Sequence, residues 1–338
     1  MAKLRVAILG SGQIARTHAR SCKAVPEVEL VAAANWRPES LARFAEEWSI
    51  PRTTTSFDEL AADPEVDAVI NTLPNFLHKP ETIRMLRAGK HVLLEKPMAR
   101  NAAEAEEILA VASETDRVFM MGHNWRFDDH VNWLRNVISA DLVGDVVKTQ
   151  GYHLNPPFFG PPEGWILDKE KAGGGAVIDM VVHSIDTTRY LLGDPMPVRV
   201  YAEIGTHYSP HDQVEDEGTF MVRWDNGIYS VFVTANYNPY QERPEGGIEV
   251  WGSRGHGQIF PSELHLKLGE VMGTFVPVFP EREQQVDYPM FQKQVEHFAD
   301  CVRTGRSPYP GGREGLIAMQ VVDAVYESAR TGEAVQIR

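Results

Sequence analysis

A glycine-rich turn near the start of the chain constrains the fold more than any other feature. Gly10, Gly12 and Ala15 form the pattern GxGxxA, which directly follows an apolar strand pattern and opens a helical one. In this context the first glycine makes a tight turn, the second admits a pyrophosphate, and the small third residue permits close helix–strand packing. The helix N-terminus offers N–H groups to phosphates. The predicted dinucleotide contacts are Gly10, Gly12, Gln13 and Ile14, and the alternative is a turn without a ligand.

Strand and helix patterns alternate through the first 122 residues. Strands are expected at residues 3–9, 28–34, 66–72, 91–96 and 117–122, and helices at 13–23, 38–48, 78–90 and 101–115. This alternation indicates βαβ units and a doubly wound parallel sheet with helices on both faces. We therefore expect an α/β Rossmann domain over residues 1–122.

The order of elements changes after residue 122. Strand patterns follow one another at residues 145–154, 198–205, 215–224, 227–237, 247–253 and 256–260, and helices are expected near 129–138, 290–303 and 312–330. Asp225-Asn226-Gly227 between two alternating runs predicts a hairpin turn. Residues 123–338 are thus expected to form an α+β domain with a large, mostly antiparallel open sheet of five or six strands.

Composition narrows the classes of partner and compartment. A chain of 338 residues favours two domains, and a net charge of −14 argues against nucleic-acid or anionic-membrane binding. No apolar run approaches the roughly 20 residues of a membrane-spanning helix, and no signal-peptide pattern is seen. Cys22 and Cys301 form neither a disulfide framework nor a CxxC metal site. We expect a cytoplasmic protein without a metal.

The end of the second predicted strand bears on the choice of cofactor. NAD-binding turns place a carboxylate there for the ribose 2′-hydroxyl, but this chain has Asn35, Trp36 and Arg37. Losing the acid removes repulsion against a 2′-phosphate, and an arginine can pair with one. NADP(H) is therefore favoured. The alternative is NAD(H), with Asn35 bonded to the ribose and Arg37 a solvated charge.

Two more loops follow buried strands, where ligands of open α/β sheets bind. The first loop offers Thr72, Leu73, Asn75 and His78, and the second offers Glu95 and Lys96 as further cofactor contacts. Asn75 and His78 also fit helix capping. Lys96 also fits an ion pair with Glu95, although adjacent strand residues point to opposite faces.

Residues 173–193 (GGGAVIDMVVHSIDTTRYLLG) read as an apolar helix led by three glycines. At about 100° per residue, Asp179, His183, Asp186, Thr187 and Tyr190 share one stripe. Because the remaining faces are apolar, we expect the helix to be embedded and its stripe to face a cavity. The glycines are expected to make room where the chain passes the cofactor. Asp186 also fits a purely structural salt bridge.

These blocks, in this order and spacing, resemble the Gfo/Idh/MocA family of oxidoreductases. The resemblance covers essentially the whole chain, and the EKP and GGG-x3-D-x3-H blocks are specific. It implies a Rossmann domain joined to an open-sheet domain, a nicotinamide cofactor, and a sugar, polyol or related keto compound as substrate. It also implies a homodimer or homotetramer formed through the exposed face of the C-terminal sheet. The family's catalytic positions correspond to Lys96, Asp179 and His183 here, whereas Asn35 departs from the Asp of many NAD-dependent members.

The residue types fit alcohol oxidation. His183 titrates near neutrality and can move the hydroxyl proton, Lys96 can stabilise the oxygen's developing charge, and Asp179 lies one turn away. Which of Lys96 and His183 moves the proton is left open. The other predicted contacts are Asn124 and Trp165 for the cofactor, and Arg126, Tyr152 and His153, with the catalytic residues, for the substrate. The alternative for Arg126 is stabilisation of the domain junction, and for Trp165 it is packing.

The expected activity is that of an NAD(P)-dependent sugar or polyol dehydrogenase or reductase. One alternative is an NAD-dependent glycosidase that oxidises its sugar transiently. Another is a cofactor-sensing regulator, which the presence of Lys96, Asp179 and His183 disfavours.

Overall fold

The computed structural model describes residues 2–155, 163–209, 213–237, 246–279 and 289–337. Residues 156–162 of the predicted proline- and glycine-rich loop lie outside these ranges. The chain divides into two compact units. The first comprises Met1–Ala99, Ala103–Phe127 and Gln284–Leu316, and the second comprises Arg100–Ala102, Asp128–Glu283 and Ile317–Arg338. Each unit therefore contains ranges from several parts of the chain.

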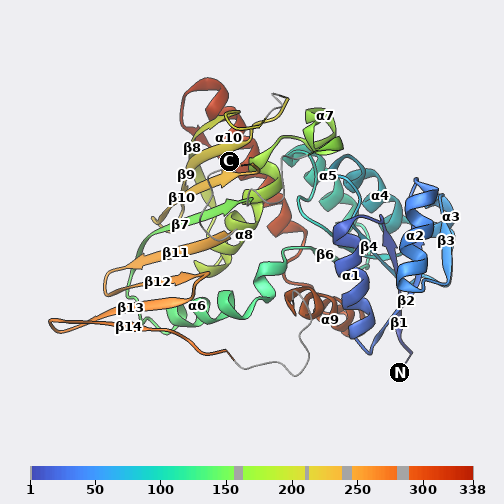
Figure 1. Cartoon of the computed structure of the whole chain (residues 1–338), viewed down its shortest axis with the longest axis horizontal. Helices are drawn as coiled ribbons and strands as arrows, with labels where there is room; N and C mark the ends of the chain where they lie inside the picture. The colour runs from blue at the N-terminus through green and yellow to red at the C-terminus, as the bar shows by residue number, and fades with distance from the viewer. Residues whose placement is uncertain (1, 156–162, 210–212, 238–245, 280–288, 338) are drawn as a thin grey trace. The chain divides into compact units, whose positions relative to one another are not determined.

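The first unit is built on a six-stranded parallel sheet in the order β3-β2-β1-β4-β5-β6 (Figure 1). Its strands are β1 (Leu4–Leu9), β2 (Val28–Ala34), β3 (Arg52–Thr54), β4 (Ala68–Asn71), β5 (His91–Leu94) and β6 (Phe119–Met121). The doubly wound sheet is confirmed. The edge strand β3 was not predicted, because its three residues are mostly exposed and carry no apolar pattern.

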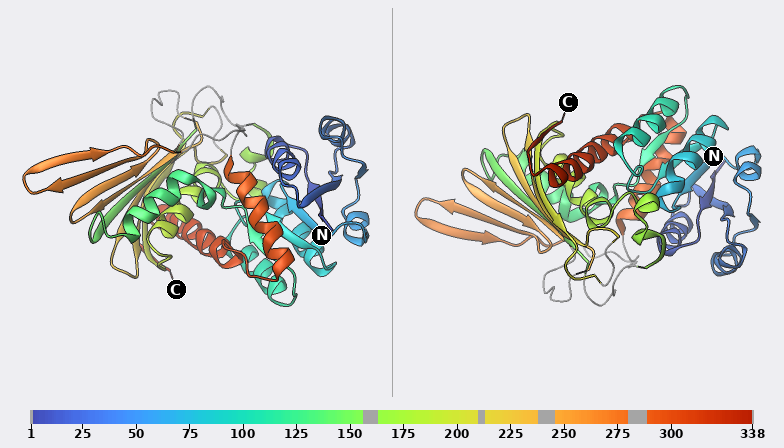
Figure 2. Two further views of the ribbon diagram at one scale, coloured as in Figure 1. Left: turned by 90° about the horizontal axis from the view of Figure 1, so that it is seen from below. Right: turned by 90° about the horizontal axis from the view of Figure 1, so that it is seen from above.

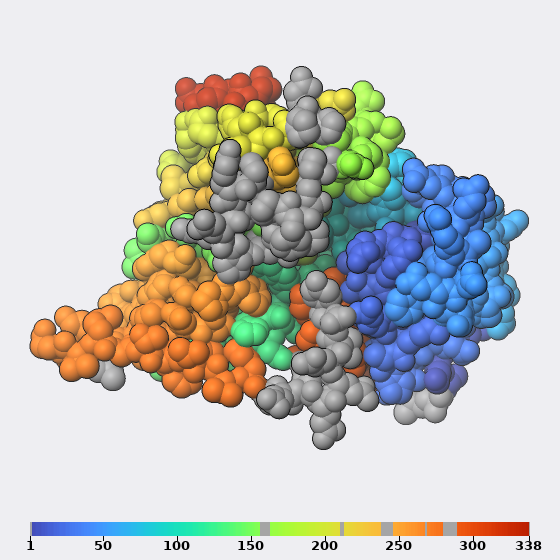
Figure 3. All heavy atoms as spheres, viewed as in Figure 1, coloured from blue at the N-terminus to red at the C-terminus, as the bar shows by residue number. Residues whose placement is uncertain are grey.

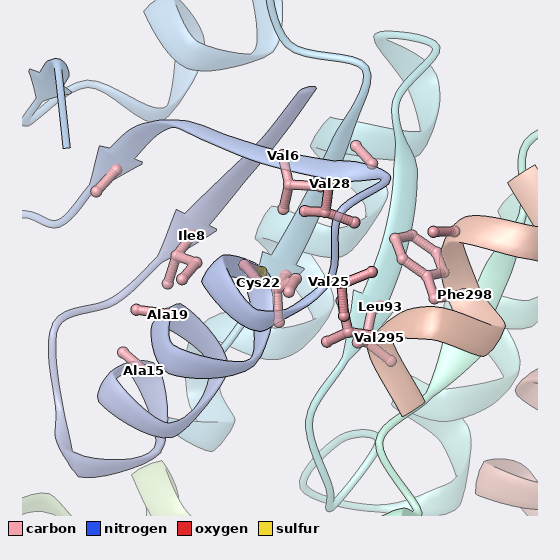
Figure 4. Packing of buried hydrophobic residues seen from close by; sticks show 14 of the residues in the cluster. Val6, Ile8, Ala15, Ala19, Cys22, Val25, Val28, Leu93, Val295 and Phe298 are labelled. Atoms are coloured by element: carbon pink, nitrogen blue, oxygen red, sulfur yellow. The ribbon is translucent and has the colours of Figure 1, made fainter. Parts of the chain in front are cut away.

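Helices of the first unit follow the strands in turn. They are α1 (Gln13–Ala24), α2 (Pro38–Trp48), α3 (Phe57–Ala62), α4 (Asn75–Arg87), α5 (Ala102–Ser113), the 3-10 helix η1 (Asn124–Phe127) and α9 (Pro289–Thr304). Helix α9 packs on α1, and its Val295 and Phe298 join Val6 and Leu93 in one core (Figure 4). Burial of each such side chain contributes about 1.5–3 kcal/mol, so the first unit needs this distant segment.

The second unit is built on a nine-stranded sheet in the order β14-β13-β12-β11-β7-β10-β9-β8-β15. Its strands are β7 (Val146–Leu154), β8 (Pro197–Gly205), β9 (Glu217–Trp224), β10 (Tyr229–Ala235), β11 (Gly246–Gly252), β12 (Gly255–Ile259), β13 (Glu263–Leu268), β14 (Val271–Phe275) and β15 (Val335–Gln336). Only the β7–β10 pair is parallel, so the mostly antiparallel open sheet is confirmed. The predicted hairpin is also found, with Gly227 at φ +86° between β9 and β10.

Three strands exceed the five or six that were expected. β14 is exposed on both faces and β15 has two residues, so neither shows a period-two pattern. β13 does alternate (ELHLKL), and that signal was overlooked. β13 and β14 form a hairpin at the edge of the sheet that extends past the neighbouring strands (Figures 1 and 3).

Helices cover one face of the nine-stranded sheet. The helices of this unit are α6 (Asp129–Ser139), η3 (Gly164–Leu167), α7 (Lys169–Ala172), the π-helix η4 (Val177–Val181), α8 (Val182–Leu191) and α10 (Gly312–Thr331). Of these, α6, η4 and α8 pack directly on the strands (Figure 2). Along β9, buried and exposed residues alternate, as expected for a sheet covered on one side. Among the described helices, none has the length and apolar character to cross a bilayer.

Candidate active site

The two glycines of the first turn meet different surroundings. Gly10 adopts φ +103°, and a Cβ there would lie 2.7 Å from Oγ1 of Thr72. Gly10 is thus required by packing of the turn against the loop after β4. A Cβ at Gly12, in contrast, would meet nothing within 4 Å. Gly12 precedes α1 as its N-cap and offers no side-chain cap, so the open space lies where backbone N–H groups can receive an anion.

Asn35 is buried at the end of β2 and belongs to a small polar network. Its Nδ2 donates to Oγ of Ser11, which lies 2.7 Å from Oγ of Ser40 in the first turn of α2. Oδ1 of Asn35, and Oδ1 of Asn124 at η1, are buried without a hydrogen-bond partner among the described residues. Buried acceptors of this kind are normally satisfied, so these two amides fit a polar ligand such as a dinucleotide. Asn35 is joined to the glycine-rich turn through Ser11.

Trp36 and Arg37 are exposed immediately after Asn35. Arg37 occupies the N-cap position of α2, and its guanidinium lies 5.6 Å from the centroid of the Trp36 ring. Trp36 in turn lies edge-on to Phe76 of α4. The arginine therefore stands at a helix N-terminus, where an anion is favoured.

The loop after β4 is held by its own side chains. Oγ1 of Thr72 donates to the carbonyl of Leu9, and the ring nitrogens of buried His78 lie 2.7 Å from the carbonyls of Leu73 and Pro97. Burial lowers the pKa of His78, and the hydrogen bonds to the two carbonyls oppose that effect. Asn75 is the first residue of α4 and not its N-cap, which is Pro74. His78 therefore ties the loop after β4 to the loop after β5.

Lys96 stands out in the loop after β5. From Val92 to Ala99 it is the one residue that is not buried. The preceding carboxylate of Glu95 is buried, accepts from the backbone N–H of Lys96 at 3.2 Å, and lies 2.7 Å from Nε2 of buried His18. The Lys96–Pro97 peptide bond is cis. Glu95 thus shapes the loop that presents Lys96.

Sequence reasoning missed His18. It lies on the buried stripe of α1 with Ala15, Ala19 and Cys22, and a polar residue on such a stripe is a usable signal. Its partner Glu95 lies in the loop after β5, 77 positions away, which the pattern of α1 does not reveal.

The glycine-led segment of the second unit is not one continuous α-helix. The π-helix η4 carries Asp179, and α8 begins after it and carries His183. From Gly174 to Leu191 every residue is buried except Asp179 and His183. The five polar residues expected on one stripe therefore fall into two groups, with Asp179 and His183 partly exposed and the other three buried. Asp186 and Thr187 are buried, and Tyr190 bonds with Asn132 and Arg135 of α6. A π-turn adds a residue to one turn, so a constant 100° step cannot place the stripe.

The three glycines lie against neighbouring groups of the protein. A Cβ at Gly174 would overlap the hydroxyl of Tyr326, and one at Gly175 would overlap the carbonyl oxygen of Glu215. Gly173 has φ +90°, and its Cβ would lie 2.6 Å from the carbonyl of Arg100. Packing inside the second unit is sufficient to require all three glycines. Room for a passing cofactor stays a prediction.

Two predicted substrate residues of β7 fall on opposite faces of the sheet. The ring of His153 lies 5.2 Å from that of His183. Tyr152 pairs with Gly247 of β11, and its hydroxyl donates to the carbonyl of Phe260 at 3.3 Å. Because adjacent strand residues point to opposite faces, the structure brings His153 to His183 but does not bring Tyr152 there.

The remaining candidates are placed as follows. Arg126 is buried in the first unit, with its guanidinium 4.7 Å from the centroid of the Tyr309 ring of the same unit. Trp165 is half-buried in η3 of the second unit. Among the residues that the structure describes, no three His, Cys, Asp or Glu side chains are grouped to hold a metal ion.

Comparison with known proteins adds to this geometry. Residues 4–123 match the model of an oxidoreductase family with an NAD-binding Rossmann fold, and residues 131–257 match the GFO/IDH/MocA C-terminal domain. A 1,5-anhydro-D-fructose reductase from Ensifer adhaerens is 29% identical, with 98% of each chain covered. An aldose-aldose oxidoreductase from Caulobacter crescentus, solved with glycerol, is 30% identical over 99% of each chain, with a TM-score of 0.86. A levoglucosan dehydrogenase solved with NADH has a TM-score of 0.92 at 22% identity over 99% of each chain, and so shares the fold.

Proposed function

The chain belongs to the Gfo/Idh/MocA family of oxidoreductases, and from that premise we propose that it transfers a hydride between a nicotinamide cofactor and a sugar, a polyol or a related keto-sugar. One observation carries the assignment of its residues. Lys96 in the loop after β5, and Asp179 and His183 in the glycine-led segment, are the residues left uncovered in otherwise buried stretches. Reactive side chains that are accessible on rigid, buried backbone are what a catalytic site requires.

In this proposal His183 and Lys96 act on the same substrate oxygen. When bound, the nicotinamide supplies the hydride acceptor or donor. His183 takes the proton from the substrate hydroxyl during oxidation and returns it during reduction, which suits an imidazole near neutral pH. The Lys96 ammonium stabilises the negative charge that develops on that oxygen. Asp179 orients the substrate or the imidazole, and His153 extends the polar surface beside His183.

The cofactor contacts that we propose in the first unit lie in the glycine-rich turn after β1, at the end of β2, in the loops after β4 and β5, and in η1. The N–H groups after Gly12, at Gln13 and Ile14, receive the pyrophosphate. Asn35, Thr72, Leu73 and Asn124 line the nucleoside portions. His78 and Glu95 act indirectly, because their polar atoms are bonded within the protein. The backbone of the two loops is held in place by these bonds.

We propose NADP(H) as the preferred cofactor. The end of β2 carries no carboxylate at residues 35–37 to repel a 2′-phosphate, and Arg37 occupies the N-cap position of α2. Asn35 also serves either ribose, because its amide can turn to offer oxygen or nitrogen. Arg37→Ala tests the preference: it should raise the Kd of NADPH about tenfold, the loss of a charge-assisted pair, and change that of NADH little. Equal effects on both cofactors contradict the preference.

Turnover of a sugar panel tests the activity itself. The purified chain is mixed with either cofactor and with aldoses, anhydrosugars and inositols, and reduced nicotinamide is followed by its absorbance. Lys96→Ala should lower kcat about 10²–10³-fold while cofactor still binds. Sugar release without net change in reduced nicotinamide identifies the glycosidase alternative. Near-normal turnover of Lys96→Ala contradicts the role of that residue.

We propose that a second copy of the chain covers the open face of the nine-stranded sheet. Cross-strand pairing aligns one row of side chains on this face, called here the transverse row: Arg199, Arg223, Tyr229, Lys148, Trp251, His256, His265 and Thr274. At one end Arg199 and Arg223 are directly opposed. Together with Tyr201, Met221 and Tyr229 they line a cavity of about 160 Å³. Opposed like charges are unfavourable, and a carboxylate between them offsets this.

The same face supplies suitable carboxylates. Glu249 and Glu263 lie beside the histidine end of the transverse row, where they contact His256 and His265. In a two-fold dimer the same face meets itself, so one copy's arginines can meet the other copy's acids. Arg223→Glu combined with Trp251→Glu should yield a monomer in sedimentation experiments. Arg43→Glu, an exposed control on α2, should not. An unchanged mass in the double variant contradicts this interface.

A cytoplasmic location stays a prediction. Both cysteines are free and buried, and burial raises the pKa of Cys22 to about 12, so neither is placed to form a disulfide. Cell fractionation would test the location.

A further inference from the structure

One buried carboxylate binds the start of the segment that carries Asp179 and His183. Oε1 of Glu215 accepts from the N–H of Gly175 at 2.9 Å and from the N–H of Val177 at 3.1 Å. The carbonyl oxygen of Glu215 accepts from the N–H of Ala176 at 3.0 Å. The first N–H groups of a helix have no partner within the helix. Here three in succession are satisfied by a single residue.

Tyr326 of α10 completes this contact. Its hydroxyl donates to the same Oε1 at 2.7 Å, and its ring and hydroxyl occupy the space that a side chain at residue 174 would fill. The carbonyl of Glu215 likewise excludes a side chain at residue 175. Gly174 and Gly175 are therefore glycines because Tyr326 and Glu215 pack directly against their backbone.

The held turn leads directly into the candidate catalytic residues. The N–H of Asp179 donates to the carbonyl of Gly175 at 3.1 Å, and His183 follows one turn later. Oγ1 of Thr234 donates to the carbonyl of Ala176 at 3.0 Å or to that of His153 at 3.2 Å. The backbone before Asp179 is thus fixed to β10 and to Glu215.

We infer that Glu215, supported by Tyr326, is a positioning residue that fixes the π-turn and thereby the orientation of Asp179 and His183. The inference rests on the proposed function for the catalytic role of those two residues, but the positioning itself is a structural property. A negative carboxylate at the positive end of the segment adds a favourable charge interaction. Burial raises the pKa of Glu215, and the hydrogen bonds that its carboxylate accepts from Tyr326, Val177 and Gly175 counter that effect.

Asp216 provides a matched control next in the chain. It is also buried, and its carboxylate accepts from the N–H groups of His207, Tyr208 and Ser209. Glu215 and Asp216 therefore perform the same kind of backbone binding for different segments. Their alanine variants separate loss of positioning from general loss of stability.

The experiment measures hydrogen exchange by mass spectrometry and steady-state kinetics on full-length variants. In Glu215→Ala, amides of residues 175–183 should exchange about tenfold faster or more, because two N–H groups lose a buried acceptor. In Asp216→Ala the increase should fall on residues 206–209 instead. Glu215→Gln keeps an acceptor oxygen and should restore most protection. Tyr326→Phe removes one donor and should give a smaller increase than Glu215→Ala.

The kinetic measurements test how positioning affects the reaction. Glu215→Ala should lower kcat about tenfold or more and change the dependence of kcat on pH, with the Kd of cofactor unchanged. Asp216→Ala should leave the pH limb as it is. Unchanged exchange over residues 175–183 in Glu215→Ala overturns the inference, as does exchange that rises equally in Asp216→Ala. If Glu215→Ala does not fold, unchanged exchange in both Glu215→Gln and Tyr326→Phe overturns it. Absence of hydride transfer in the wild type refutes only the proposed function, because the exchange result stands by itself.

Discussion

The buried His18–Glu95 pair gives a stability prediction whose size follows from its geometry. Nε2 of His18 and Oε1 of Glu95 are 2.7 Å apart, and both residues are at most 5% exposed. His18→Phe keeps a ring against Phe291, which His18 meets edge-on at 5.3 Å, but removes the bond to the carboxylate. A hydrogen bond to a charged group contributes about 1.5–3 kcal/mol. We therefore expect a loss of about 2–3 kcal/mol in the free energy of unfolding.

A double-mutant cycle isolates that interaction. Glu95→Met leaves Nε2 of His18 buried without its acceptor, and we expect a loss of about 1–3 kcal/mol for an unsatisfied buried group. The double variant replaces both partners by apolar groups of similar size, a change that can be nearly neutral. The two single losses should therefore exceed the loss in the double variant, with a coupling energy of about 1–3 kcal/mol.

Urea unfolding followed by tryptophan fluorescence measures the three variants against the wild type. Turnover gives a second readout, because Glu95 also accepts from the N–H of Lys96. Both single variants should lower kcat while binding cofactor. Losses that add within about 0.5 kcal/mol would refute the reasoning, because they would mean that the two side chains do not interact.

Three further predictions use other parts of the structure. Gly10→Ala should cost about 1–3 kcal/mol in stability because it forces a side chain to φ +103°, whereas Gly12→Ala should leave urea stability unchanged and weaken cofactor binding; equal stability losses contradict the distinct roles. His183→Asn should abolish the pH-dependent limb of kcat, and an unchanged profile assigns the proton to another group. The pKa of Asp67 is lowered first by its hydrogen bond with Arg5, so that stabilisation is present above about pH 4 and is lost on further acidification. Asp67→Asn should therefore be less stable than wild type at neutral pH, and the difference should close in acid; a constant gap contradicts it.

The sequence predicted the parts of the fold that local pattern determines. The parallel sheet of the first unit follows from apolar strands alternating with amphipathic helices, and the hairpin at Gly227 follows from turn chemistry. A helix was expected at α9, but its amphipathic pattern could not predict that it packs in the core of the first unit. Strand β14 has exposed side chains throughout, so its sequence shows no alternation of apolar and polar residues.

In the candidate site, too, some features follow from local sequence pattern and others depend on contacts with distant residues. Lys96, Asp179 and His183 are polar residues in apolar stretches, and that contrast is visible in sequence. The face of Tyr152 depends on the register of β7 against β11, and a single-residue shift would have reversed it. The π-turn depends on contacts with Glu215, which lies in another part of the chain.

Two buried polar side chains, His78 and Glu215, bind backbone groups, whereas the proposed catalytic side chains Lys96 and His183 are partly exposed. His78 reaches two carbonyls, and Glu215 reaches two N–H groups and a tyrosine hydroxyl. A buried group with satisfied bonds is costly to displace, so each fixes the loop or turn beside it. Lys96 and His183 project from backbone held in this way. Substitutions at His18, His78 or Glu215 should therefore lower turnover without removing any group that touches the substrate, and rescue by conservative variants should separate them from Lys96 and His183, where no such rescue is expected.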